Sequence, residues 1–159
     1  MPAGSATVIA STESLEVTPA GSIVGPIWLG HGASGSAFPE QGWSDFSVAL
    51  LAAWIPPLQR LMRRGEAAEC HFMEGPYHFV ATSRGSQHWS IACFERRDAD
   101  VRVGNAVLEL DATPADFLGS AITTAKALLG YCDARGWWND DTERLRRAVE
   151  DGLPRSTGG

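Results

Sequence analysis

Residues 67–96 read AAECHFMEGPYHFVATSRGSQHWSIACFER and alternate strand-forming runs with two turn sequences. The runs are rich in Phe, Val, Thr, Trp and Ile, which favour strands. They are interrupted by EGPY at 74–77 and by RGSQ at 84–87, whose Gly-Ser centre is typical of a two-residue hairpin turn. The segment therefore predicts three successive antiparallel strands, which restricts the chain to folds that contain such a meander.

The two turns predict which side chains meet, because hairpin register decides the face on which each residue lies. Turns centred on their Gly-Pro and Gly-Ser pairs place Met73 opposite His78, and His78 opposite Cys93. His71 then lies diagonally from His78 on the same face. Imidazole and thiolate both bind zinc, so His71, His78 and Cys93 form a candidate metal site.

A packing role for that face is the alternative, and a slip of one residue in either hairpin would separate the three candidate ligands. The same face would carry apolar side chains, namely Met73, Val80, Trp89 and Ile91. The opposite face would carry Cys70, Phe72, Phe79, Ala81, Ala92 and Phe94. Neither face is plainly polar, so we expect both to be covered.

Helix and strand patterns flank the meander on both sides. Ser44 is a candidate cap for the helix that follows it. The two prolines at 56 and 57 predict either a kink in that helix or a helix over 44–55 followed by a second one over 57–64. Further helices are predicted at 114–135, capped by Thr113 and ended by Gly136, and at about 140–151. Short strands are predicted at 15–18, 23–29, 101–103 and 106–110.

These elements predict an α+β fold: an antiparallel meander sheet of about five to six strands, with two main helices packed on it and a short C-terminal helix. A chain of 159 residues with 44% apolar content supports one core, so residues 14–153 are expected to form a single domain. Residues 1–13 and 154–159 are small and polar and are expected to be disordered.

Composition limits the partners. The net charge of −6 and the lack of a long basic run disfavour nucleic acid and anionic membranes, and favour a basic protein partner. Three well-separated cysteines favour a reducing cytoplasm over a disulfide framework. The N-terminal residues lack the features of a secretion signal, and no stretch is apolar enough to span a bilayer. No cofactor is expected.

The loop after residue 29 contains two motifs of low specificity. GHGASG at 30–35 matches the G-x-G-x-x-G pattern of dinucleotide sites, but FPEQG at 38–42 follows where that fold requires a helix and then a parallel strand. Ser34 and Ser36 lie near His31, yet the glycines do not flank either serine as they do in a hydrolase elbow. A flexible loop is the favoured interpretation.

Two adjacent tryptophans, Trp137 and Trp138, occupy a corner between predicted helices and cannot easily both point inward. An exposed tryptophan beside acids is typical of protein-binding hot spots. The acids are Asp140 and Asp141 next to the pair, and Asp98 and Asp100 in another loop. Their alternative role is as solvated helix-start and turn residues.

Three sequence features, FPEQGWSDF at 38–46, Trp54, and FMEGPY at 72–77, together resemble a pattern in small bacterial α+β proteins, some of which are immunity partners of secreted toxins. The resemblance implies a protein that binds another protein and supplies no catalytic residue. The leading prediction is therefore a non-catalytic binding protein that neutralises a bacterial toxin, with Trp137, Trp138 and the four aspartates in its interface.

Two alternatives belong to other functional classes. The first is a small enzyme or metal-binding sensor that uses His71, His78 and Cys93. The second is a binding protein for an apolar ligand, held in a closed pocket between sheet and helices and lined by Trp54, Trp89 and Phe94.

Overall fold

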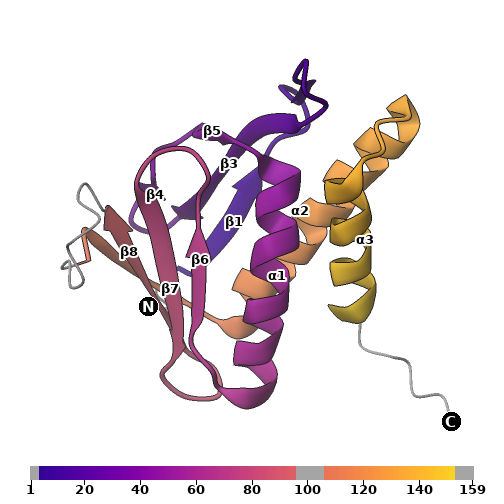
Figure 1. Cartoon of the computed structure of the whole chain (residues 1–159). Helices are drawn as coiled ribbons and strands as arrows, with labels where there is room; N and C mark the ends of the chain where they lie inside the picture. The colour runs from indigo at the N-terminus through magenta and orange to yellow at the C-terminus, as the bar shows by residue number, and fades with distance from the viewer. Residues whose placement is uncertain (1–3, 96–105, 153–159) are drawn as a thin grey trace, which may run out of the picture.

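The structure, a computed structural model, describes residues 4–95 and 106–152. It has an α+β fold with antiparallel sheets, as the sequence predicts. One sheet has five strands and the other four, and the helices lie along one side of them (Figure 1). The elements are β1 (Ala6–Ala10), β2 (Glu16–Val17), β3 (Ile23–His31), β4 (Ser36–Phe38), β5 (Ser44–Asp45), α1 (Ser47–Arg64), β6 (Ala68–His71), β7 (Tyr77–Ser83), β8 (Trp89–Glu95), β9 (Leu108–Ala112), α2 (Pro114–Arg135) and α3 (Asp140–Gly152).

The expected meander forms the four-stranded sheet, in the order β6-β7-β8-β9. One face of it is buried beneath α1 and α2. The Trp54 ring of α1 packs edge-on against Phe72 and Phe79, at centroid distances of 4.9 and 5.0 Å, and Phe117 of α2 lies 5.8 Å from Phe79. Strand alternation therefore selects the core face, because every second side chain of each strand points to the helices.

The register of both hairpins differs from the prediction. His71 lies opposite His78, a shift of two residues that keeps both on one face. In the second hairpin Phe79 lies opposite Cys93 and His78 opposite Phe94, a shift of one residue. The cause is a five-residue loop, 84–88, closed by a 2.8 Å hydrogen bond from Arg84 N–H to the His88 carbonyl, in place of a two-residue turn. This shift moves Cys93 to the buried face.

The five-stranded sheet is built around β3, which pairs with β1, β2, β4 and β5. The prediction that residues 1–13 are disordered is wrong for β1, in which Ala6 and Val8 are buried. The backbone of Val8 is also bonded to α2: its N–H donates to Ser120 Oγ at 2.8 Å, and its carbonyl accepts from Thr124 Oγ1 at 3.4 Å. Part of what holds this strand could not be read from its own residues, because the hydroxyls of Ser120 and Thr124 lie more than 100 residues away in the sequence.

Of the two alternatives predicted for Pro56-Pro57, the split into two helices is wrong, because α1 is one helix that contains both prolines. Both prolines are partly exposed, whereas Trp54, Ile55 and Leu58 on either side are fully buried. Burial of the apolar face thus compensates for the lost backbone hydrogen bonds. Ser44 does not cap this helix either: it lies in β5, the N-cap is Phe46, and no side chain caps it.

Helix α2 follows its sequence signals closely. Thr113 Oγ1 accepts from Asp116 N–H at 3.1 Å, Pro114 is the first helical residue, and Gly136 ends the helix in the left-handed region with φ 68°. Helix α3 packs on α1, where buried Gln59 of α1 donates from Nε2 to the Ala148 carbonyl at 3.1 Å. The strand predicted at 101–103 lies outside the described residues.

Candidate functional site

A sharp corner joins α2 to α3, and both adjacent tryptophans lie in it. Two backbone hydrogen bonds fix the turn: Gly136 N–H donates to the Asp133 carbonyl at 3.2 Å, and Trp137 N–H donates to that of Cys132 at 2.9 Å. Glycine suits the first of these positions because its φ is positive. The corner therefore has a defined backbone, although it lies at the surface.

The two tryptophans differ in burial: Trp137 packs against the protein, and Trp138 is exposed to solvent. Trp137 is partly buried and packs edge-on against Tyr131, with centroids 5.8 Å apart. The Arg135 guanidinium lies 3.4 Å from the Tyr131 centroid and continues this stack. Trp138 is 72% exposed. One indole of the adjacent pair is thus exposed to solvent, as the sequence predicts.

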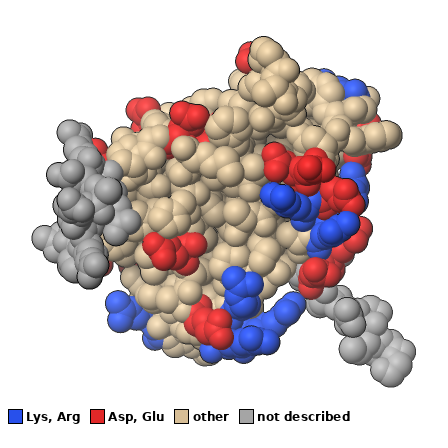
Figure 2. Space-filling model, in the orientation of Figure 1, with Lys and Arg blue, Asp and Glu red and all other residues tan. Residues whose placement is uncertain are grey.

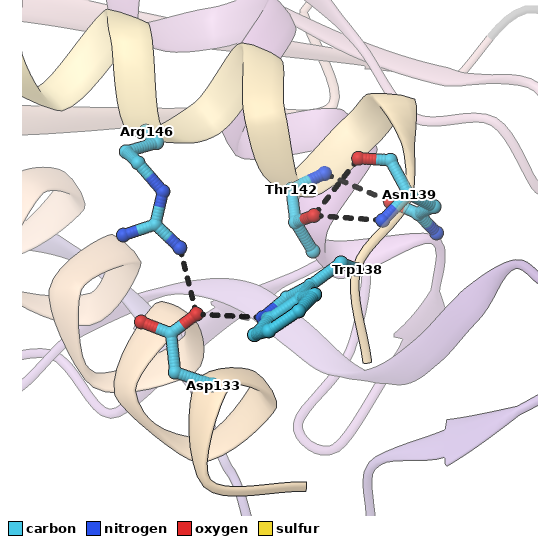
Figure 3. A network of polar contacts seen from close by, with 5 residues as sticks. All are labelled: Asp133, Trp138, Asn139, Thr142 and Arg146. Atoms are coloured by element: carbon cyan, nitrogen blue, oxygen red, sulfur yellow. Dashed lines mark hydrogen bonds and ion pairs between the residues drawn. The ribbon is translucent and has the colours of Figure 1, made fainter. Parts of the chain in front are cut away.

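The Asp133 side chain of α2 holds the exposed indole of Trp138 in place (Figure 3). Trp138 Nε1 donates to Asp133 Oδ1 at 3.1 Å, and the same oxygen accepts from Arg146 Nη2 of α3 at 2.7 Å. The hydrogen bond from Arg146 lowers the pKa of the Asp133 carboxyl, and the bond from Trp138 acts in the same direction. Because its pKa is lowered, this carboxyl group is ionised at neutral pH and can accept both hydrogen bonds.

Asn139 and Thr142 make a reciprocal cap at the start of α3. Thr142 N–H donates to Asn139 Oδ1 at 2.8 Å, and Asn139 N–H donates to Thr142 Oγ1 at 2.9 Å. Asn139 Nδ2 also donates to the Gly21 carbonyl at 2.9 Å, in the turn between β2 and β3. The corner is therefore tied to the five-stranded sheet as well as to α3.

Two hollows open at this corner. A groove of about 410 Å³ lies between α2 and α3, and its lining includes Asp133, Glu143 and Arg146. A pocket of about 240 Å³ lies between the corner and the β2–β3 turn, and its lining includes Val17 and Ile23. Both hollows are also lined by Trp138 and Asn139.

The acids named by the sequence are only partly gathered at this corner. Asp140 is exposed and Asp141 partly exposed in the first turn of α3, and neither has an ion-pair partner within the described part of the chain. Glu143, by contrast, pairs with Arg147 at 2.7 Å. Figure 2 shows acidic and basic side chains interleaved over α3. Asp98 and Asp100 lie outside the described residues.

The candidate metal site is not formed. The His71 and His78 rings stack with centroids 4.8 Å apart, but Cys93 lies on the opposite, buried face of the sheet. Burial raises the pKa of the Cys93 thiol to about 12, which disfavours the thiolate that binds zinc. Across residues 4–95 and 106–152, no group of three or more His, Cys, Asp or Glu side chains could hold a metal ion.

The predicted apolar ligand pocket is also not formed by its three aromatic residues. Trp54 and Trp89 are fully packed on the helix-covered face. Phe94 lies on the other face, stacked on His78 at 4.9 Å. Trp89 and Phe94 are five residues apart on β8, so strand alternation places them on opposite faces of the sheet whatever the register.

His31 and Ser34 shape the turn between β3 and β4. His31 Nδ1 accepts from Ser34 N–H at 3.2 Å and lies 3.0 Å from Ser34 Oγ, which in turn is 2.9 Å from Ser36 Oγ. A ring nitrogen that accepts a backbone N–H acts as a local cap. This arrangement accounts for the serine and histidine residues of the loop without catalysis.

Sequence reasoning named Trp137 and Trp138 together, without saying which is exposed, and missed the residues that hold Trp138. The Asn139-x-x-Thr142 spacing is a capping signal and could have been read. The contact between Asp133 and Arg146 could not have been predicted from the sequence, because the two residues lie on different helices that tertiary packing brings together.

No significant match was found in comparisons of the chain with protein-family models, with curated proteins and with solved structures. Among the described helices, none is both long and apolar enough to cross a membrane. The function must therefore be argued from the geometry of the corner.

Proposed function

We propose that this protein acts by binding another protein through the α2–α3 corner, in the manner of an immunity protein that neutralises a toxin. One observation carries the proposal: the Trp138 indole is 72% exposed and yet fixed by a hydrogen bond to Asp133. A large aromatic surface that is already ordered loses little entropy on binding. Exposed tryptophans of this kind dominate many protein interfaces.

The proposed partner carries a basic surface. Asp140 and Asp141 follow Trp138 closely in the sequence and have no ion-pair partner among residues 4–95 and 106–152, and the whole chain has a net charge of −6. Such charges accelerate the encounter with a basic partner. The resemblance to immunity proteins supports the same role. We place the protein in the cytoplasm, because its cysteines at 70, 93 and 132 are all buried free thiols, which suits a reducing compartment.

Replacement of Trp138 tests the proposal directly. Wild type and Trp138→Ala are immobilised in equal amounts, and proteins retained from an extract of the native host are identified by mass spectrometry. The partner retained by the wild type is then purified, and its Kd is measured against both. Loss of a hot-spot tryptophan costs at least about 2 kcal/mol, so Trp138→Ala should weaken binding roughly 30-fold.

Met73→Ala is the matched control, because Met73 is 55% exposed in the β6–β7 turn, away from the corner. It removes a comparable exposed apolar side chain and should leave the Kd unchanged. If both variants bind the purified partner as tightly as the wild type, the corner is not the interface.

A further inference from the structure

Strand β9 forms one edge of the four-stranded sheet and, in the described part of the chain, is paired on one side only, with β8. Just after the strand, Thr113 turns its N–H away from β8 and donates to Ser5 Oγ at 2.9 Å. Backbone groups of successive strand residues point to alternate sides, so those of Asp111 and Glu109 also point outward. Within residues 4–95 and 106–152, no group bonds the outward N–H and C=O groups of these two residues.

Two other outer strands have their free edge covered by a helix. The backbone of Val8 in β1 bonds the hydroxyls of Ser120 and Thr124 of α2. Strand β6 lies against α1, where Trp54 Nε1 donates to the His71 carbonyl at 2.9 Å. Proteins commonly cover strand edges in this way, because an open edge is a template for a further strand. The described residues provide no such cover along β9.

The side chains beside the open edge are acidic. Glu109 and Asp111 are exposed and lie on the sheet face opposite the helices, since Leu110 between them is buried beneath the helices. Glu109 has no ion-pair partner among the described residues. Asp111 lies 2.8 Å from His88, which offsets its charge only when the imidazole is protonated. At least one carboxylate beside the edge is therefore not compensated.

This charge disfavours pairing of the edge with a second copy of the chain. An antiparallel pair of two β9 strands centred on Leu110 would place Glu109 of each copy opposite Asp111 of the other. Like charges directly opposite each other destabilise a pair of strands. A strand with basic side chains at those positions would instead be attracted.

We propose that β9 binds an extended segment of a partner protein as a fifth strand of this sheet, and that the segment alternates basic and apolar residues. Partner residues opposite Glu109 and Asp111 exchange backbone hydrogen bonds with them and turn Lys or Arg side chains to the acidic face. The residue opposite Leu110 turns to the helix-covered side and is apolar. Strand addition is a common mode of peptide recognition. The inference goes beyond the proposed function, because it does not depend on Trp138.

The fold limits the length of the added strand. At the end of β9, Thr113 closes the edge because its N–H is already bonded. At the start, Val107 N–H turns back to the Cys93 carbonyl at 2.8 Å. The partner can therefore pair only along the five residues of β9. A pocket of about 280 Å³ opens beside Asp111 and Ala112, so the space next to this end of the strand is not filled.

Amide hydrogen exchange of the full-length protein, measured by NMR, tests the inference with a defined probe. The probe is the peptide Lys-Val-Lys-Val-Lys-Val-Lys, acetylated at its N-terminus and amidated at its C-terminus. At saturating peptide, we expect exchange of the Glu109 and Asp111 N–H groups to slow at least tenfold, because each gains a backbone acceptor. The N–H of Leu110 is the internal reference: it already faces β8 and should change little.

Methylation of the peptide nitrogens tests backbone pairing without any change to the protein. The lysine N–H groups are the ones that face β9 in the proposed strand, and the valine N–H groups point away from it. Methylation of the lysine nitrogens should therefore abolish protection of Glu109 and Asp111. Methylation of the valine nitrogens is the matched control and should leave the protection in place.

Substitutions of Glu109 separate backbone pairing from charge. Glu109→Gln keeps the N–H and should weaken peptide binding severalfold. Glu109→Pro also removes the outward N–H and leaves the bonds to β8 in place, because proline is tolerated where an edge N–H faces solvent. It should abolish the protection of Asp111. Glu150→Gln removes the same charge from an exposed position on α3 and should bind the peptide as the wild type does.

Each outcome bears on a different part of the inference. Unchanged exchange of Glu109 and Asp111 at saturating peptide would overturn strand addition. Equal protection by Glu-Val-Glu-Val-Glu-Val-Glu would overturn the basic character of the partner. Protection that rises with protein concentration in the absence of peptide would assign the edge to a second copy and overturn the partner segment. Trp138→Ala should behave as the wild type throughout, so failure of this inference is distinguishable from failure of the binding corner.

Discussion

Asp45 shows how one buried side chain connects distant parts of this fold. It has no exposed surface, and its two oxygens accept three N–H groups: Trp43 Nε1 at 3.1 Å, Phe46 N at 2.7 Å and Glu74 N at 3.1 Å. The carboxyl group thereby ties the start of α1 to the β6–β7 turn. All three donors are protein groups, so an acceptor must be present at this position.

Asp45→Asn should therefore be strongly destabilising. The amide has one oxygen and one NH₂ group, so at least one buried donor would face another donor. We expect a loss of about 2–4 kcal/mol in the free energy of unfolding, measured in urea. Asp111→Asn is the control, because Asp111 is exposed and pairs only with His88, and it should change stability by less than about 0.5 kcal/mol. Equal effects would contradict the role of Asp45.

The Asp133 contact makes the Trp138 indole sensitive to acid. The pKa of Asp133 is lower in the folded protein than in the unfolded chain, so its contribution is complete above the ordinary carboxyl pKa. This contribution to stability is lost as the pH falls through the lower pKa that Asp133 has in the folded protein. We expect the NMR signal of Trp138 Nε1–H to shift over that acidic pH range in the wild type. The Asp133→Asn variant should show no such shift, because it has no carboxylate to protonate at this position.

The indole N–H of Trp54 provides an internal control for this titration, because it donates to the backbone carbonyl of His71 at 2.9 Å and not to a carboxylate. Its signal should stay constant while that of Trp138 moves. A simultaneous shift of both signals would mean that acid unfolds the protein before it protonates Asp133.

At the scale of elements, α1 is less stable than its length suggests. Pro56 and Pro57 each remove a backbone donor from the helix interior, and a proline there is about 3 kcal/mol less favourable than alanine. Pro56→Ala should raise the free energy of unfolding by about 1–3 kcal/mol, less the part offset by a more flexible unfolded chain. Urea unfolding measures this gain. A decrease would mean that the proline ring itself packs favourably.

The elements that the sequence predicts well are those whose signals are local. Helix α2 carries its cap, its first-turn proline and its terminal glycine within its own residues, and all three act as expected. Hairpin register, in contrast, depends on contacts with residues that are distant in the sequence and on the length of the loop. The turn after β6 is held by the bond from Glu74 N–H to Asp45, 29 residues earlier, and the next loop is longer than its Gly-Ser pair suggests.

This difference explains why the candidate metal site does not form, whereas the exposure of one of the two adjacent tryptophans was predicted correctly. The His71, His78 and Cys93 set depended on two registers, and one shift of a single residue removed the cysteine. The corner depended only on two adjacent bulky residues between helices. Its supporting contacts, Asp133 with Arg146 and Asn139 with Gly21, required the packed structure.

On the scale of the whole molecule, the buried apolar residues of both sheets and all three described helices form one continuous cluster. Strand β1 is part of it, since Ala6 has no exposed surface and Val8 only 2%. The strand also lies between β3, with which all five of its residues pair, and α2, whose hydroxyls bond its backbone. We therefore expect both sheets to unfold in a single cooperative transition that requires β1.

Deletion of residues 1–10 tests this dependence. It removes buried apolar side chains, leaves β3 with an unpaired edge and leaves Ser120 Oγ without the N–H that it accepts. We expect a loss of more than about 3 kcal/mol in the free energy of unfolding, because burial of a valine alone contributes roughly 1.5–3 kcal/mol. Deletion of residues 1–3 is the control, since it leaves every paired residue of β1 in place. If the two deletions unfold at the same urea concentration, β1 contributes nothing to the stability of the core, and the segment could be removed without disturbing α2 or the corner that follows it.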